Sequence, residues 1–265
     1  NNKLKFRNFL NVLKGTEWNL FEIMICRSKR ARFVVTRDDL SAYNLKKWHL
    51  NIITSNPMMD GLIVVETPKQ LISYKKIIIL PGSRMPELIN NFKRIMKIIE
   101  EIDDSKEEIL YFCPLFSQKS INSVCEYLVG KKFKEINPVS KKLDILKGYT
   151  NITKTVTIYF GYRTFRKWAG ICDIGITSSG TATEQISGLG VPSVSIVGKG
   201  PQFGKQFALR QKRILGGCVS VSYNYKTAAK EAKRILNNKN LRSFLGNIGM
   251  TRVNKGGGTK IISDQ

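Results

Sequence analysis

Residues 77–84 read Ile77-Ile78-Ile79-Leu80-Pro81-Gly82-Ser83-Arg84, and residues 172–184 read Cys172-Asp173-Ile174-Gly175-Ile176-Thr177-Ser178-Ser179-Gly180-Thr181-Ala182-Thr183-Glu184. In each stretch an apolar run typical of a buried parallel strand stops at a turn of small residues, and a helix is expected to follow. The amino end of a helix presents free N–H groups and the positive end of its dipole, which together attract an anion. Because the pattern occurs twice, the sequence predicts a phosphorylated ligand.

The order of the expected elements indicates the fold class. From residue 76 onward, apolar and amphipathic segments alternate. They predict strands over 76–80, 109–113, 156–160, 172–176, 193–197 and 218–221 with a short one near Phe133, and helices over 86–102, 119–129, 163–169, 181–189, 206–215, 226–236 and 241–248. Residues 137–153 are expected to be an irregular surface segment. This alternation predicts an α/β fold with a Rossmann-like parallel sheet covered on both faces, whose ligands bind beyond the carboxyl ends of the strands.

A smaller βαβ step is expected before this region. Strands over 33–35 and 50–53 flank a helix over 37–47, and turn-forming residues around Pro57 then interrupt the pattern. We therefore expect a domain boundary at this point. The boundary divides the chain into residues 1–56 and residues 57–265.

Composition argues against several classes of protein. A chain of 265 residues with 42% hydrophobic content can bury a core. No run approaches the roughly 18 to 20 apolar residues that span a bilayer, and residues 1–11 lack the apolar stretch of a secretion signal, so a cytoplasmic location is expected. The five cysteines are scattered without a C-x-x-C pair, and His49 is the single histidine. Neither a disulfide framework, a metal site nor a Ser/His/Asp triad is indicated.

The net charge is the most unusual bulk property. Lys and Arg number 44 against 20 Asp and Glu, which gives +24 and favours anionic partners such as phosphates, nucleic acid or acidic lipid headgroups. Lysine content also rises when the base composition of a genome drifts, and here the lysines are spread along the chain. A functional basic face and a compositional bias both account for this charge.

The first turn offers Gly82, Ser83 and Arg84. Glycine allows the backbone to approach a ligand closely, the serine hydroxyl can donate a hydrogen bond, and the planar guanidinium suits a phosphate group. The alternative interpretation is an ordinary helix start with a surface arginine.

The second turn offers Ser179, Gly180 and Thr181, with Glu184 one helical turn later. We expect the helix end to face a diphosphate and the Glu184 carboxylate to accept hydrogen bonds from a ribose diol. The same spacing also fits a capping box formed by Thr181 and Glu184. A third loop at the same edge, residues 198–204, is expected to line the ligand with Lys199 and Gln202, and it also fits a simple turn of the chain.

Four sequence blocks together resemble a known family. They are Asn56-Pro57-Met58-Met59-Asp60-Gly61, Leu80-Pro81-Gly82-Ser83-Arg84 with Glu87, Ser179-Gly180-Thr181-Ala182-Thr183-Glu184, and Gly200-Pro201-Gln202-Phe203 with Gln211. In this order the blocks are similar to the lipid-A-disaccharide synthase family, more closely its synthase-related proteins, within the two-domain GT-B glycosyltransferases. The resemblance runs from about residue 32 to the end of the chain.

The resemblance implies that residues 1–56 are the remnant of an amino-terminal acceptor domain and that residues 57–265 form a complete nucleotide-sugar-binding domain. It also implies a UDP-sugar as the donor substrate and no other cofactor. Gly82, Ser83 and Arg84 would lie near the diphosphate, Ser179, Gly180 and Thr181 at the second helix end, and Glu184 on the ribose. No metal is expected, because the helix ends and the arginine would offset the phosphate charge.

The implied reaction is inverting hexosyl transfer in lipid A biosynthesis, to a lipid-linked or glycolipid acceptor at the anionic surface of the inner membrane. Its base would come from an amino-terminal domain, of which residues 1–56 supply only the last βαβ step. The catalytic residue therefore stays unassigned. We expect the chain to bind donor and to transfer sugar poorly.

Two other functions fit the sequence. A UDP-sugar epimerase would share the fold, but its chemistry needs several acid or base groups and the sequence clusters few. A non-enzymatic basic module could bind nucleic acid or anionic lipid. The one run of interleaved aromatic and basic residues, 162–168, fits an amphipathic helix equally well, so nucleic acid is the less expected partner.

Overall fold

The computed structural model describes residues 18, 20–48, 51–62, 66–102, 108–198, 204–253 and 256–264. The chain divides into two compact units, Asn1–Asp60 with Arg252–Gln265, and Gly61–Thr251. The sequence pattern predicts that residues 252–265 belong to the second domain, but in the structure they belong to the first unit. Local hydrogen bonds explain this, because the Asp60 carboxylate accepts from the backbone N–H groups of Gly257, Gly258 and Thr259.

The first unit contains the expected βαβ step. Its elements are α2 (Leu20–Cys26), β1 (Val34–Thr36), α3 (Asp39–Lys46), β2 (Ile52–Thr54), a 3-10 turn (Pro57–Met59) and α11 (Gly258–Ser263). Strands β1 and β2 pair in parallel, which confirms the step. Helix α3 begins where it does because the Asp38 carboxylate accepts a hydrogen bond from the backbone N–H of Ser41 at 2.7 Å.

The second unit is built on an eight-stranded sheet. Its strands are β3 (Lys75–Leu80), β4 (Ile109–Leu115), β5 (Lys134–Ile136), β6 (Lys147–Thr150), β7 (Val156–Tyr162), β8 (Ile174–Thr177), β9 (Ser193–Ile196) and β10 (Val219–Ser222). They lie in the order β10-β9-β8-β3-β4-β7-β6-β5. All neighbours from β10 to β7 pair in parallel, and β6 runs antiparallel to both β7 and β5. The predicted α/β fold with a mostly parallel sheet is confirmed.

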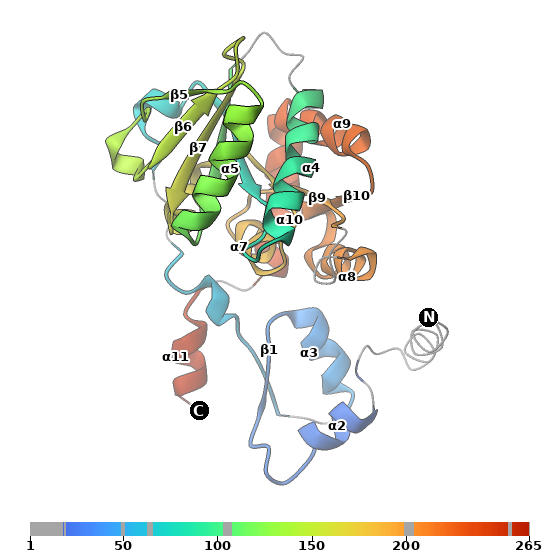
Figure 1. The fold of residues 1–265 in the computed structure, drawn as a ribbon. Helices are drawn as coiled ribbons and strands as arrows, with labels where there is room; N and C mark the ends of the chain where they lie inside the picture. Colours follow the sequence, from blue (N-terminus) through green and yellow to red (C-terminus); the bar gives the residue numbers. More distant parts are fainter. Residues whose placement is uncertain are drawn as a thin grey trace. The chain divides into compact units, whose positions relative to one another are not determined.

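Helices connect the strands and cover the sheet. They are α4 (Glu87–Ile102), α5 (Gln118–Gly130), α6 (Phe165–Trp168), α7 (Thr181–Gly188), α8 (Lys205–Leu215), α9 (Tyr225–Leu236) and α10 (Lys239–Arg252). Helix α4 packs against both α5 and α9, and Figure 1 shows the three helices together beside the sheet. None of the helices in the described segments is long and apolar enough to cross a membrane.

Strand β3 shows why its apolar run is continuous. Ile77 and Ile79 belong to one core cluster with residues of α4, α5 and α9, whereas Ile78 and Leu80 belong to a second cluster that contains Trp168. Alternate side chains of a strand point to opposite faces, and both faces are buried here, so every position from Ile77 to Leu80 is apolar.

One sequence-based expectation was wrong. Residues 137–153 are not irregular throughout, because they contain strand β6, which pairs antiparallel with the following strand β7. The strand is short and contains Gly148, a residue type that is depleted in strands, so its pattern is weak in the sequence. The glycine is needed for packing, since a Cβ at position 148 would lie 2.9 Å from Cε1 of the Tyr159 ring.

A buried ion pair fixes the amino end of β3. Lys76 is 6% exposed, and its ammonium group lies 3.4 Å from the carboxylate of Asp173, the residue that precedes β8. The backbone N–H of Lys76 donates to the same carboxylate at 2.8 Å. These contacts link the amino ends of β3 and β8, which pair in parallel. The turns that follow the carboxyl ends of the two strands therefore lie side by side.

Candidate functional site

The strand order contains a topological switch point between β3 and β8. The chain leaves β3 toward β4 on one side, and leaves β8 toward β9 on the other. At such a point the two connections diverge and open a crevice beyond the carboxyl ends of the strands, where ligands of open α/β sheets bind. The turn after β3 and the turn after β8 are the two candidate anion-binding turns from the sequence.

The turn after β3 is held by a few specific contacts. The backbone N–H of Ser178 donates to the carbonyl of Leu80 at 2.8 Å, and the Asn91 side chain donates to the carbonyl of Pro81 at 3.0 Å. Gly82 has a φ of +102°, a conformation that side chains with a Cβ rarely adopt. Glycine therefore allows the chain to turn here, and Ser83 and Arg84 are exposed beyond it.

The turn after β8 leads into α7. Gly180 is the N-cap residue and makes no side-chain cap, and Thr181 lies inside the helix, so the alternative interpretation as a capping box of Thr181 and Glu184 does not apply. The Gly180 carbonyl accepts hydrogen bonds from the backbone N–H groups of Thr183 and Glu184 and, at 2.8 Å, from the side-chain amide of Gln211. Gln211 thus fixes the start of α7 from a neighbouring helix.

A cavity of about 630 Å³ joins the two turns. We call it the switch-point cavity. Its lining is Leu80, Pro81, Gly82, Ser83, Arg84, Pro114, Phe116, Phe165, Ser178, Ser179, Gly180, Thr181, Ala182, Gln185 and Phe207. Six of the predicted site residues, which are Gly82, Ser83, Arg84, Ser179, Gly180 and Thr181, therefore lie around one space. Among the described residues, Arg84 is the one charged side chain in this lining, and the amino end of α7 adds a partial positive charge, so the cavity suits an anion.

One predicted site residue, Glu184, does not line the cavity, and another lies outside the described residues. Glu184 is 8% exposed and does not line the cavity, whereas the next residue, Gln185, does. Adjacent helical positions point about 100° apart, and the helix starts so that Thr181 and Gln185 share the cavity face. Gln202 lies outside the described residues, as do His49 and Lys199.

The sequence-based reasoning missed the aromatic part of the cavity. Phe116 follows the end of β4, Phe165 begins α6 after β7, and Phe207 lies on α8. A Cβ at Gly180 would lie 3.0 Å from Cζ of Phe207, so the glycine and this ring are in close contact. The signal was available in part, because Phe116 follows a parallel strand at the same edge of the sheet.

No group of three or more His, Cys, Asp or Glu side chains in the described part of the chain is placed to hold a metal ion. The four cysteines Cys113, Cys125, Cys172 and Cys218 are buried and unpaired, and Cys26 is partly exposed. Burial raises the pKa of the Cys218 thiol to about 11. None of these cysteines lines the switch-point cavity.

Comparison with solved structures identifies the fold. The chain is similar to a candidate UDP-N-acetylglucosamine 2-epimerase from Listeria monocytogenes (TM-score 0.58, 15% identity), covering 88% of this chain and 57% of that one. It is also similar to S. aureus MnaA in complex with UDP (TM-score 0.57, 12% identity, 88% and 59% covered). A third similar structure is the UDP-GlcNAc 2-epimerase from Neisseria meningitidis bound to UDP-GlcNAc (TM-score 0.55, 13% identity, 92% and 62% covered).

The chain has an α/β, Rossmann-like fold of the GT-B type. It spans about three fifths of the length of each of the three similar proteins. No protein-family model matches the sequence, and no curated protein matches it.

Proposed function

We propose that this chain binds a UDP-sugar in the switch-point cavity, as the nucleotide-sugar part of an inverting glycosyltransferase resembling lipid-A-disaccharide synthase. The observation that carries the proposal is the convergence of Arg84, the Gly82 turn and the amino end of α7 on one cavity at the switch point. A diphosphate carries the charge that these groups would offset.

The lining suggests how the ligand is divided between its walls. Backbone N–H groups of the two turns donate hydrogen bonds to the diphosphate, and the Arg84 guanidinium forms an ion pair with it. The rings of Phe116, Phe165 and Phe207 provide apolar surface for the uracil and ribose. Gln185, and not Glu184, lines the cavity, and its side-chain amide would hydrogen-bond to the ribose hydroxyls.

The proposed chemistry needs a base that the cavity does not supply. Within the described residues the lining contains neither a carboxylate nor a histidine. Transfer to an acceptor requires such a group to remove a proton from the attacking hydroxyl. We therefore propose that the chain binds the donor well and transfers sugar slowly, with a lipid-linked or glycolipid acceptor favoured by the net charge of +24.

A UDP-sugar epimerase is the second candidate. It is favoured by the comparison itself, since the three similar structures include one bound to UDP and one epimerase bound to UDP-GlcNAc. The two reactions leave different products. Incubation with UDP-GlcNAc alone would give its 2-epimer from an epimerase, and no new sugar nucleotide from a transferase that lacks its acceptor.

Thermal unfolding with added ligands tests the binding proposal. At a UDP concentration of about 100 times Kd, binding stabilises the folded state by about 2.7 kcal/mol, which raises Tm by roughly 5–11 °C for a unit of this size. UDP and UDP-GlcNAc should produce this shift, and uridine should produce little, because it lacks the diphosphate.

Variants locate the effect. Arg84→Ala should reduce the shift, because it removes the charged side chain of the cavity. Arg210→Ala removes an exposed arginine of α8 outside the lining and should leave the shift unchanged. An absence of any shift with UDP or UDP-sugars, or an equal loss in both variants, would count against the proposed site.

A further inference from the structure

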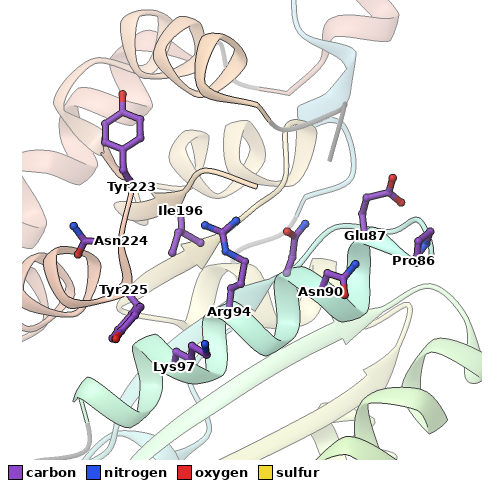
Figure 2. Close-up of a pocket in the computed structure, with 10 residues that line it drawn as sticks. Pro86, Glu87, Asn90, Arg94, Lys97, Ile196, Tyr223, Asn224 and Tyr225 are labelled. Carbon is purple, nitrogen blue, oxygen red and sulfur yellow. The ribbon is translucent and has the colours of Figure 1, made fainter. Parts of the chain in front are cut away.

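The described residues enclose a second large cavity, of about 700 Å³, which we call the α4–α9 cavity. It lies between α4 and the segment that joins β10 to α9 (Figure 2). Its lining is Pro86, Glu87, Asn90, Asn91, Arg94, Lys97, Ile196, Tyr223, Asn224 and Tyr225. None of the residues that the structure describes lines both cavities. The arrangement is therefore a separate site on the same unit.

Arg94 is the most informative residue of this cavity. Figure 2 shows its guanidinium directed from α4 toward Ile196. It is half-buried and donates a hydrogen bond to the carbonyl of Val197. Burial lowers the pKa of Arg94, which means that its charge is incompletely solvated. In the described part of the chain no carboxylate forms an ion pair with it. A guanidinium has five N–H donors, so donors remain for an anion from outside.

A second cation reinforces this charge. Lys97 lines the cavity, and its ammonium group lies 6.0 Å from the centre of the ring of Tyr225, another lining residue. Among the described residues of the lining, Glu87 is the one carboxylate. The balance of charge around the α4–α9 cavity is positive.

Polar neighbours add to the recognition surface. Asn90 is exposed on α4, one helical turn before Arg94, and carries an amide that can donate to a phosphate oxygen. The Asn224 side chain is already used, because it caps α9 by accepting from the backbone N–H of Thr227 at 2.9 Å. This cap keeps the Tyr223–Tyr225 segment in place opposite α4.

We propose that the α4–α9 cavity binds the phosphate group of a second small ligand, held by Arg94 and Lys97 with Asn90 beside them. The site is independent of the switch-point cavity and of the function proposed for it. A soluble phosphate compound and a lipid headgroup share this chemistry, and the experiment below separates them.

Titration calorimetry with inorganic pyrophosphate, at about 0.15 M salt to screen diffuse surface attraction, measures binding at both proposed cavities. The binding that belongs to the α4–α9 cavity is the part that an Arg84→Ala variant retains. Lys97→Gln and Arg94→Gln should each weaken binding roughly tenfold or more, because a charged hydrogen-bonding group is lost. Lys93→Gln is the matched control. Lys93 is also an exposed lysine of α4 near a tyrosine ring, at 5.6 Å from the centre of Tyr127, but it does not line the cavity.

The outcomes are distinct. Weaker binding in Lys97→Gln with wild-type binding in Lys93→Gln supports the site, even if Arg94→Gln proves less stable through loss of its bond to Val197. Wild-type binding by Lys97→Gln, or an equal loss in Lys93→Gln, would overturn it. Sedimentation with vesicles of phosphatidic acid and phosphatidylcholine identifies the source. If Lys97→Gln also binds vesicles less than Lys93→Gln does, the ligand is a headgroup, and otherwise it is a soluble compound.

Discussion

Replacement of Gly82 by alanine tests the geometry of the turn after β3. The φ of +102° at this position is unfavourable for a residue with a Cβ, and an added Cβ would lie 3.7 Å from the Ser178 carbonyl oxygen, an ordinary contact. The penalty is therefore conformational and not steric. An L-residue forced into a left-handed conformation costs about 1–2 kcal/mol.

This penalty can be converted into an expected melting temperature. For a unit of this size, 1 kcal/mol corresponds to roughly 2–4 °C, so Gly82→Ala should lower Tm by about 2–8 °C. Gly130→Ala is the matched control. Gly130 ends α5, has no atom within 4 Å of an added Cβ and has no positive φ. It should melt at the wild-type temperature or slightly above it, because alanine is favoured over glycine in helices by about 0.5–1 kcal/mol.

The same variant has a second readout. If the turn relaxes to accommodate alanine, the backbone N–H groups of Ser83 and Arg84 move, and UDP should bind more weakly in titration calorimetry. The reasoning would be refuted if Gly82→Ala melted like Gly130→Ala, since the positive φ would then impose no cost.

Three further changes probe other parts of the structure. Gln211→Leu should leave Tm nearly unchanged, because loss of the hydrogen bond to the Gly180 carbonyl is offset by removal of a side-chain oxygen that is buried without a partner among the described residues. UDP binding should nevertheless weaken, because the start of α7 loses this support. An unchanged affinity in calorimetry would contradict this. Lys76→Met should lower the free energy of unfolding in urea by about 1–3 kcal/mol, because it leaves the Asp173 carboxylate without its nearest cation; wild-type stability would contradict it. Hydrogen bonds from the side chain and backbone of Thr259, with two further N–H groups, lower the pKa of Asp60 from its ordinary value of 3.8 to about 2. A lowered pKa means that this carboxylate stabilises the fold above pH 3.8 and ceases to do so as the pH falls through about 2. A carboxyl NMR titration with a midpoint near 3.8 would disprove this.

Much of the fold could be predicted because its signals are local. The run from Ile77 to Leu80 in β3 is apolar at every position, and β8 carries Ile174 and Ile176, a pattern typical of parallel strands that are buried on both faces. The turn residues Gly82 and Gly180 lie directly after these runs, so the position of both turns at one edge followed from the direction of the strands. Strand β6 escaped prediction because four residues that include Gly148 carry too weak a pattern.

The details of the site depend on geometry that the sequence does not state. The choice between Glu184 and Gln185 depends on where α7 begins, and a shift of one residue turns a side chain by about 100°. Phe165 and Phe207 are distant from the two turns in sequence, and the sheet brings them to the same edge. The sequence pattern does not distinguish Arg94 from other basic residues of its helix, because its partial burial and its hydrogen bond to the Val197 carbonyl depend on the tertiary structure.

A crystal structure of the chain with UDP tests the central claim most directly. The account predicts that the diphosphate lies in the switch-point cavity, within hydrogen-bonding distance of the Arg84 guanidinium and of backbone N–H groups at the start of α7. Ordered UDP at any other place, with Arg84 and Gly180 making no contact to it, would contradict the claim.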